Sequence, residues 1–422
     1  MGHSPLLLQL VIILGTARVL GWVLRYFGQP AVIGEMAAGL VLGPIVLGFF
    51  APELHADVFD KNSLGALQGL SELGLVLFMF IVGAELRLPM GVRQQLVSAS
   101  WIGSLSVLVP MLLGLGVATL VHQDLAPAGV AFWPFALFMA SAMSITAFPV
   151  MARILKERKA TSTTVGRLSL TGAAVADALA WVLLALVVVL AGSGRDWGHF
   201  SRTVAGLAVL ALLLFFVMRP AVASLLARFA SDGRPEGSLL AILLIGAFGC
   251  AYVTEILDVH AVFGAFLFGV CLPRDDRLLA SLIERIEHVA LIVMMPIFFA
   301  LAGLNTTPDA FVGTGLGALA IILAAAVFGK IFGGAFGARL AGQPWRTSFA
   351  VGSLMNARGL MELIVIKVGL DIGVISDELF TMLLVMALVT TIMTGPLLTL
   401  LMGRETQQED CSATLGKRRQ GS

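Results

Sequence analysis

The sequence predicts an all-α protein that crosses a membrane many times. Of its 422 residues, 58% are hydrophobic and only 13% are charged, whereas an average soluble protein has about 25% charged residues. The mean hydropathy is +0.97. Apolar segments of about 20 residues, the length that crosses a hydrocarbon core of about 30 Å, recur from Leu6 to Met402. We therefore expect one transmembrane domain at 1–402 and a short, disordered cytoplasmic tail at 403–422.

The polar breaks between apolar segments predict thirteen spans. These are 5–25, 29–50, 64–86, 95–121, 131–155, 164–193, 203–229, 237–257, 259–273, 284–304, 311–339, 346–370 and 378–402. If alternate loops are assigned to the two sides, one side receives 20 Lys and Arg residues and the other receives 3. One missed span would invert every later loop and remove this contrast. The positive-inside rule then predicts an N-terminus outside and a C-terminus in the cytoplasm, in the cell (inner) membrane.

Several functions are disfavoured by composition. A net charge of +1 gives no indication of a nucleic-acid partner. The three cysteines and six histidines lack the spacing of metal ligands, so we predict no metal and no cofactor. The first apolar run has no basic segment before it and no small-residue cleavage site, which favours a first span over a removed signal peptide.

Two opposite charges are predicted to lie at one depth in the membrane. Asp177 is ten residues from Arg167, about 15 Å along a helix, and Lys330 is nine residues from Arg339, about 13–14 Å. Ionisable groups at this depth cost at least about 2.5–3.5 kcal/mol each, so they usually mark function. An ion pair that only fixes packing is the alternative, although buried pairs rarely stabilise better than apolar ones. Gly329, Gly333 and Gly337 predict close helix packing around Lys330.

Two predicted spans carry helix breakers and polar groups in their middle. They contain "SITAFPVMARI" (144–154) and "SLMNARGLMELI" (353–364), with Pro149 and Gly359 as the breakers. Both share the pattern polar-Ala-x-breaker-x-Met, starting at Thr146 and Asn356. Spans five and twelve run in opposite directions, so we predict inverted repeats with two crossing discontinuous helices. Their free carbonyls and the side chains of Thr146 and Asn356 would serve a small cation.

At these residues the chain resembles the cation:proton antiporter superfamily, in the branch of bacterial sodium/proton and potassium/proton exchangers and plant cation/proton exchangers. The resemblance covers the whole chain. It is carried by "GQPAVIGEMAAGLVLGP" (28–44), "SITAFPVMARIL" (144–155), "AAVADALAW" (173–181) and "MNARGLMELI" (355–364).

The resemblance implies a role for each polar residue of these motifs. Asp177 would be the carboxylate shared by cation and proton, and Lys330 its basic partner. Thr146 and Asn356 would lie at the crossing of the broken helices. The supporting polar positions are Ser144, Arg358 and Glu362. A homodimer with a dimer domain and a moving core domain is also implied. Glu35 is predicted to line a cytoplasmic funnel, with a packing pair or a gate as open alternatives.

One position departs from the family pattern. Relatives usually have two polar residues in tandem, but here Ala176 precedes Asp177. Stoichiometry and electrogenicity are therefore left open. Lys330 either pairs directly with Asp177 or releases a proton of its own.

The sequence thus predicts a secondary transporter that exchanges Na⁺ or K⁺ for protons by alternating access. A passive cation channel, and a symporter or organic-solute carrier on the same fold, are the alternatives. An intramembrane enzyme is disfavoured because no histidine lies in the middle of a span. The expected partners are a monovalent cation, the proton, the lipid bilayer and a second copy of the chain.

Overall fold

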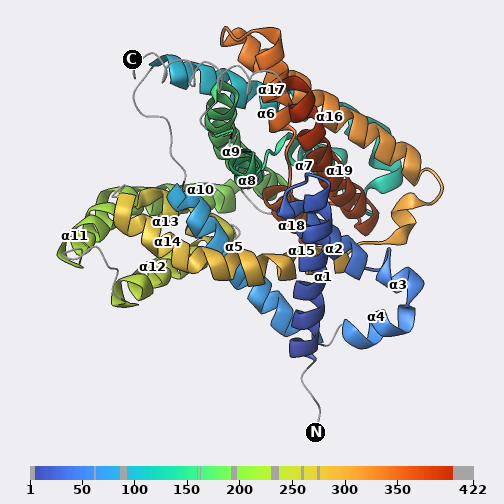
Figure 1. The fold of residues 1–422 in the computed structure, drawn as a ribbon, viewed down its shortest axis with the longest axis horizontal. Coiled ribbons are helices and arrows are strands. Elements are labelled where there is room, and N and C mark those ends of the chain that lie inside the picture. The colour runs from blue at the N-terminus through green and yellow to red at the C-terminus, as the bar shows by residue number, and fades with distance from the viewer. Residues whose placement is uncertain are drawn as a thin grey trace, which may run out of the picture. The chain divides into compact units, whose positions relative to one another are not determined.

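The structure, a computed structural model, is helical in every regular element that it describes (Figure 1). The described residues are 5–60, 63–85, 93–158, 160–161, 163–191, 197–229, 237–257, 261–272 and 276–402. Within these ranges, nine helices are long and apolar enough to cross a membrane. The predicted all-α, multi-pass class is therefore confirmed. The predicted tail at 403–422 lies outside the described residues.

The chain divides into two compact units. The first unit comprises residues 1–23, 34–87 and 188–307. Its elements are α1 (Leu6–Tyr26, up to Val23), α2 (Ala31–Leu42, from Gly34), α3 (Leu47–Phe50), α4 (Pro52–Val58), α5 (Gly65–Glu85), α10 (Trp197–Leu213), η2 (Leu214–Met218), α11 (Arg219–Phe229), α12 (Gly237–Ile256), α13 (Ala261–Cys271), α14 (Asp276–Val289), η3 (Ala290–Met294) and α15 (Met295–Leu304). Phe80 of α5 stacks on Phe268 of α13 at 5.9 Å between ring centroids, inside a buried apolar core.

The second unit comprises residues 24–33, 88–187 and 308–422. Its elements are α6 (Arg93–Leu125), α7 (Phe132–Ser144), α8 (Phe148–Glu157), α9 (Thr164–Ala191, up to Val187), η4 (Pro308–Phe311), α16 (Gly315–Leu340), α17 (Trp345–Met355), α18 (Leu360–Asp371) and α19 (Asp377–Met402). Both predicted helix interruptions fall in this unit.

Glycines let α16 approach α6 at backbone distance. A Cβ added to Gly333 would lie 2.5 Å from the carbonyl oxygen of Leu105, and one added to Gly329 would lie 2.8 Å from the Cα of Pro110. Real Cβ atoms do not come so close to a backbone, so only glycine fits here. The predicted close packing around Lys330 is confirmed. Helix α6 also approaches α9, where a Cβ on Gly103 would lie 2.7 Å from the Gly172 carbonyl oxygen.

The two predicted interruptions correspond to α7 with α8 and to α17 with α18. The first breaks at Ile145–Ala147 and the second at Asn356–Gly359. The first helix stops at Ser144, before Pro149. Pro149 is the second residue of α8, where a missing backbone N–H is tolerated.

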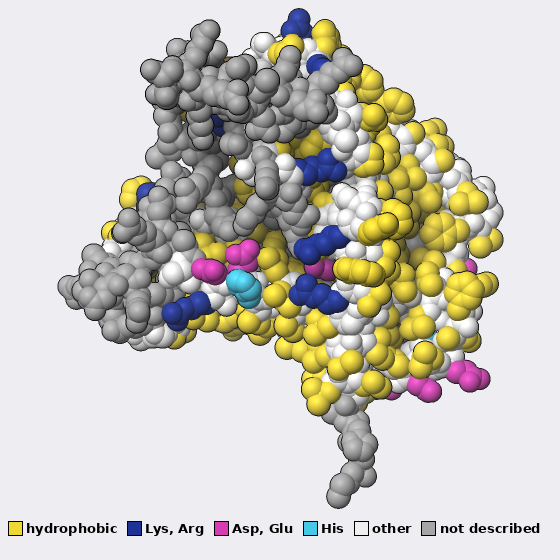
Figure 2. Space-filling view, in the orientation of Figure 1, with side chains coloured by type: hydrophobic (Ala, Val, Ile, Leu, Met, Phe, Trp, Pro, Cys, Tyr) yellow, Lys and Arg dark blue, Asp and Glu magenta, His cyan; other side chains and the backbone are white. Residues whose placement is uncertain are grey.

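The exposed surface of α16 and α17 is apolar and aromatic. Phe328 stacks on Phe332 at 5.8 Å, and the guanidinium of Arg339 lies 5.4 Å from the ring centroid of Trp345 near the end of α16. Aromatic rings beside a cation are typical of the region where a helix leaves the hydrocarbon core. Hydrophobic side chains also make up most of the described surface on the face shown in Figure 2. The surface is therefore suited to lipid.

Candidate functional site

Asp177 is a buried carboxylate with one oxygen free. It lies on α9 and is 2% exposed. The backbone N–H of Phe148, the first residue of α8, donates a hydrogen bond to the carboxylate. The positive end of a helix favours a negative charge at this place. Within the described residues, the Oδ1 atom has no hydrogen-bond partner, so it remains available to a small cation or a proton.

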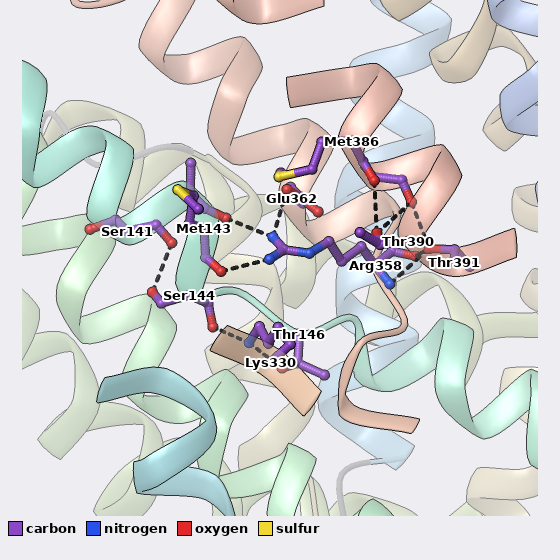
Figure 3. Close-up of polar contacts among 12 residues, drawn as sticks. Ser141, Met143, Ser144, Thr146, Lys330, Arg358, Glu362, Met386, Thr390 and Thr391 are labelled. Carbon is purple, nitrogen blue, oxygen red and sulfur yellow. Dashed lines mark hydrogen bonds and ion pairs between the residues drawn. The ribbon is translucent and has the colours of Figure 1, made fainter. Parts of the chain in front are cut away.

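Lys330 lies on α16, is fully buried, and is held by neutral oxygens. Its Nζ donates to the Thr146 hydroxyl at 2.7 Å, to the Ser106 carbonyl at 3.0 Å and to the Ser144 carbonyl. Figure 3 shows the contacts with Ser144 and Thr146. An ammonium has three donors, and all three are used. Across the part of the chain that the structure describes, Asp177 acts on Lys330 electrostatically without forming a direct ion pair.

The last carbonyls of α7 accept hydrogen bonds from cationic side chains of distant segments. Ser144 contributes its carbonyl to Lys330, while Arg358 donates from Nη2 to the Met143 carbonyl at 2.7 Å and from Nη1 to the Ala142 carbonyl at 3.2 Å (Figure 3). A helix leaves its last four carbonyls unpaired and its C-terminus partly negative, so cations stabilise this end. Two positive side chains from outside α7 therefore stabilise the end of this helix at Ser144.

Arg358 also forms a buried ion pair. Its Nη1 lies 2.8 Å from Glu362 Oε1, and both side chains are 0% exposed. Glu362 lies in the first turn of α18, where a negative charge is stabilised by the helix dipole. The backbone of Arg358 is fixed by Thr391 of α19, whose hydroxyl accepts from the Arg358 N–H and donates to its carbonyl, both at 2.9 Å. The pair thus anchors the second interruption.

The two interruptions are hydrogen-bonded to each other. The Ala147 N–H donates to the Ala357 carbonyl at 3.1 Å, and the Thr146 hydroxyl lies 3.5 Å from the Met355 carbonyl. Asn356 donates from Nδ2 to the Thr390 carbonyl at 3.1 Å. Its Oδ1 is buried without a partner among the described residues. Ala147 and Ala357 occupy matching places in the shared sequence pattern, so matching residues of the two interruptions are in contact.

The structure brings most of the predicted site residues into the second unit. These are Ser144, Thr146, Asp177, Lys330, Asn356, Arg358 and Glu362. Glu35 lies in the first unit, on α2, and is 8% exposed. The side-chain hydroxyl of Ser144 donates within α7, to the Ser141 carbonyl at 2.8 Å, so only its backbone carbonyl contacts Lys330.

Four groups that hydrogen-bond to the site residues were not predicted from the sequence. They are the Ser106 carbonyl, the Phe148 N–H, Thr390 and Thr391. A signal existed for the threonines, because "VTTIMT" (389–394) places three hydroxyls within an apolar span. A signal also existed for the Ser106 carbonyl, because Pro110 stands four residues later and supplies no N–H to it.

Fold and site together define a membrane transporter. Charged groups that are gathered at interrupted helices in an apolar helical bundle are the mark of a substrate pathway.

Comparison with known proteins gives the family. The sodium/hydrogen exchanger transmembrane family matches residues 12–403, and the chain belongs to this family. It is 38% identical to the Na(+)/H(+) antiporter NhaS4 of Synechocystis over 394 residues, which cover 93% of this chain and 96% of that protein. It is 35% identical to the K(+)/H(+) antiporter 1 of Saccharomyces cerevisiae over 87% of this chain, but spans only 43% of that protein.

The fold is shared with a solved antiporter. The structure of the sodium proton antiporter MjNhaP1 from Methanocaldococcus jannaschii at pH 8 matches with a TM-score of 0.68. The match covers 94% of this chain and 97% of that chain at 14% identity. The resemblance drawn from the sequence motifs is confirmed, and the chain is a member of a transporter family rather than an enzyme.

Proposed function

We propose that this protein exchanges a monovalent cation, Na⁺ or K⁺, for protons, and that the two ions compete for Asp177. The observation that carries the proposal is the state of this carboxylate. It is 2% exposed, its Oδ1 has no partner in the described part of the chain, and Lys330 does not neutralise it by direct contact. The names of the relatives, Na(+)/H(+) and K(+)/H(+) antiporters, support the same exchange.

The cation ligands are the unpartnered oxygens at the interruptions. Asp177 Oδ1 and Asn356 Oδ1 are both buried acceptors without a donor among the described residues, and carboxylate and amide oxygens suit hard cations. The Thr146 hydroxyl already accepts a hydrogen bond from Lys330. In this conformation Thr146 therefore holds the lysine, and one acceptor site of its hydroxyl is already used.

Coupling follows from the cost of an empty site. A bare carboxylate is expensive to hold in an apolar interior, so the unit that carries Asp177 changes its access only when a proton or a cation is bound. Alternating access then moves the two ions in opposite directions. Ala176 is buried and brings no second carboxylate, so the charge carried in one cycle depends on whether Lys330 keeps its proton.

The finer architecture belongs to the same proposal. The chain would have thirteen spans in inverted repeats, with the interruptions of spans five and twelve crossing at the site. It would lie in the cell membrane with its N-terminus outside and its tail, 403–422, in the cytoplasm. Residues 1–402 would form the exchange domain, Glu35 would line a cytoplasmic funnel, and two copies would associate through a dimer domain.

The test is a proteoliposome assay with an internal pH dye. Na⁺, K⁺ and Li⁺ are added in turn, with and without a membrane potential. We expect cation-dependent proton movement against a gradient, lost in Asp177→Asn. The response to the potential gives the charge moved per cycle. Proton movement that stays intact in Asp177→Asn would show that the ions bind elsewhere, and cation flux that only ever runs downhill would indicate a channel.

A further inference from the structure

A proline removes one backbone hydrogen bond from α6 beside Lys330. Pro110 lies inside this helix and has no backbone N–H, so the carbonyl four residues earlier, that of Ser106, lacks its helix donor. The Lys330 ammonium donates to this carbonyl at 3.0 Å. The approach is close here, because a Cβ on Gly329 would lie 2.8 Å from the Cα of Pro110.

We infer that Pro110 is a positioning residue of the exchange site, because it frees the Ser106 carbonyl to hold the Lys330 ammonium. The inference rests on the proposed exchange function. Both backbone acceptors of Lys330 are then carbonyls that helices leave open. The Ser106 carbonyl lacks a helix donor because of the proline, and the Ser144 carbonyl lacks one because α7 ends there.

The charges around Lys330 come from other helices. Asp177 acts on it from α9, and Arg358 and Glu362 act from the second interruption and α18. In contrast, α6 and the α7–α8 interruption offer it neutral oxygens. Hydrogen bonds to a charged donor are roughly twice as strong as neutral ones. The free carbonyl of Ser106 therefore stabilises the ammonium form of Lys330 over the neutral amine.

The variant Pro110→Ala removes this advantage. Alanine keeps the Cβ of proline but adds an N–H, which donates along α6 to the Ser106 carbonyl and competes with Lys330. The ammonium form is then less stabilised. Because the charge of Lys330 acts on Asp177, we expect the pH profile of exchange to move by on the order of one unit, the shift that corresponds to losing part of one charge-assisted hydrogen bond.

The chain supplies a matched control in α19. Pro396 lies inside this helix, and the carbonyl that it frees, that of Ile392, accepts from the neutral amide Nε2 of Gln29 at 3.2 Å. Pro396→Ala restores the same kind of helix bond at a carbonyl that, among the described residues, accepts from an amide and not from an ammonium. We expect its pH midpoint of exchange to equal that of the wild type.

The experiment measures cation-driven proton flux against pH for the full-length wild type, Pro110→Ala and Pro396→Ala in proteoliposomes. A shifted pH midpoint in Pro110→Ala alone supports the inference. Superimposable profiles, or equal shifts in both variants, overturn it.

A second measurement decides the inference without transport. The melting temperatures of the wild type, Pro110→Ala, Lys330→Gln and the double variant are compared in detergent. A contact between the two sites makes the changes in Tm non-additive, whereas additive changes overturn the inference. If the wild type exchanges no cation, the proposed function fails, and the Tm comparison still decides the role of Pro110.

Discussion

Replacing Glu362 by Gln tests whether the buried ion pair holds the second interruption. The pair joins Arg358 Nη1 to Glu362 Oε1 at 2.8 Å, with both side chains 0% exposed. The substitution keeps the shape of the side chain but removes its charge. The Arg358 guanidinium then remains buried without a compensating carboxylate. Breaking a buried pair in this way costs about 3–5 kcal/mol of unfolding free energy.

The structure places the expected loss at the lower end of this range, about 3 kcal/mol. Arg358 keeps its hydrogen bonds to the carbonyls of Ala142 and Met143, and a glutamine oxygen still accepts from Nη1. The matched control is Asp371→Asn, which breaks the pair of Lys367 and Asp371 on the same helix. That pair also spans four residues but is 36% and 54% exposed, so its loss costs less than about 1 kcal/mol.

The assay is reversible unfolding of the purified protein in mixed micelles of a mild detergent and dodecyl sulfate. Helix content is followed as the dodecyl sulfate fraction rises. A large loss for Glu362→Gln beside a small one for Asp371→Asn supports the reasoning. Losses below about 1 kcal/mol for both variants would refute it, because the buried pair would then contribute no more than the exposed one.

Three further substitutions test the packing of α16 and the burial of His55 in α4. Gly333→Ala should lower the unfolding free energy by about 1–3 kcal/mol, since its Cβ would lie 2.5 Å from the Leu105 carbonyl oxygen. Gly317→Ala on the same helix, where nothing lies within 4 Å of the added Cβ, should raise the unfolding free energy by up to about 1 kcal/mol. Tm values in the reverse order would contradict the close packing of α16 on α6 at Gly333. Burial lowers the pKa of His55, in α4, from its ordinary value of 6.5. The unfolded chain therefore binds the proton first as pH falls. The stability of the wild type should then decline below about pH 6.5 more steeply than that of His55→Gln. Parallel curves of Tm against pH for the two proteins would contradict this expectation.

The spans were predictable because each helix must satisfy its own backbone hydrogen bonds in lipid and is therefore apolar along its length. The predicted range 378–402 corresponds to α19 at Asp377–Met402, and 311–339 corresponds to α16 at Gly315–Leu340. Asp177 and Lys330 were predicted to lie deep in the membrane from their distance to Arg167 and Arg339, and both are buried in the second unit.

The exact place of the first interruption was not predictable from local sequence. Pro149 indicated an interrupted helix but not the residue where the helix ends, because proline is tolerated in the first turn of α8. What ends α7 is the capture of its last carbonyls by Lys330 and Arg358, which stand 186 or more positions further along the chain. Local propensity carries no information about such distant donors.

The partners of Lys330 show the same limit. The sequence left open a direct pair with Asp177, whereas the structure gives its three donors to the oxygens of Ser106, Ser144 and Thr146. Two of these are backbone carbonyls, and every residue has one. Only the spacing from Ser106 to Pro110 distinguishes its carbonyl from the others in α6.

The central claim is that cation and proton compete for the one carboxylate of Asp177. The direct measurement is the apparent KM for the transported cation as a function of pH in proteoliposomes, at a fixed membrane potential. Competition predicts that the KM rises in proportion to proton concentration on the acid side while the maximal rate at saturating cation stays constant. A KM that does not change with pH, beside a maximal rate that falls with acid, would contradict it.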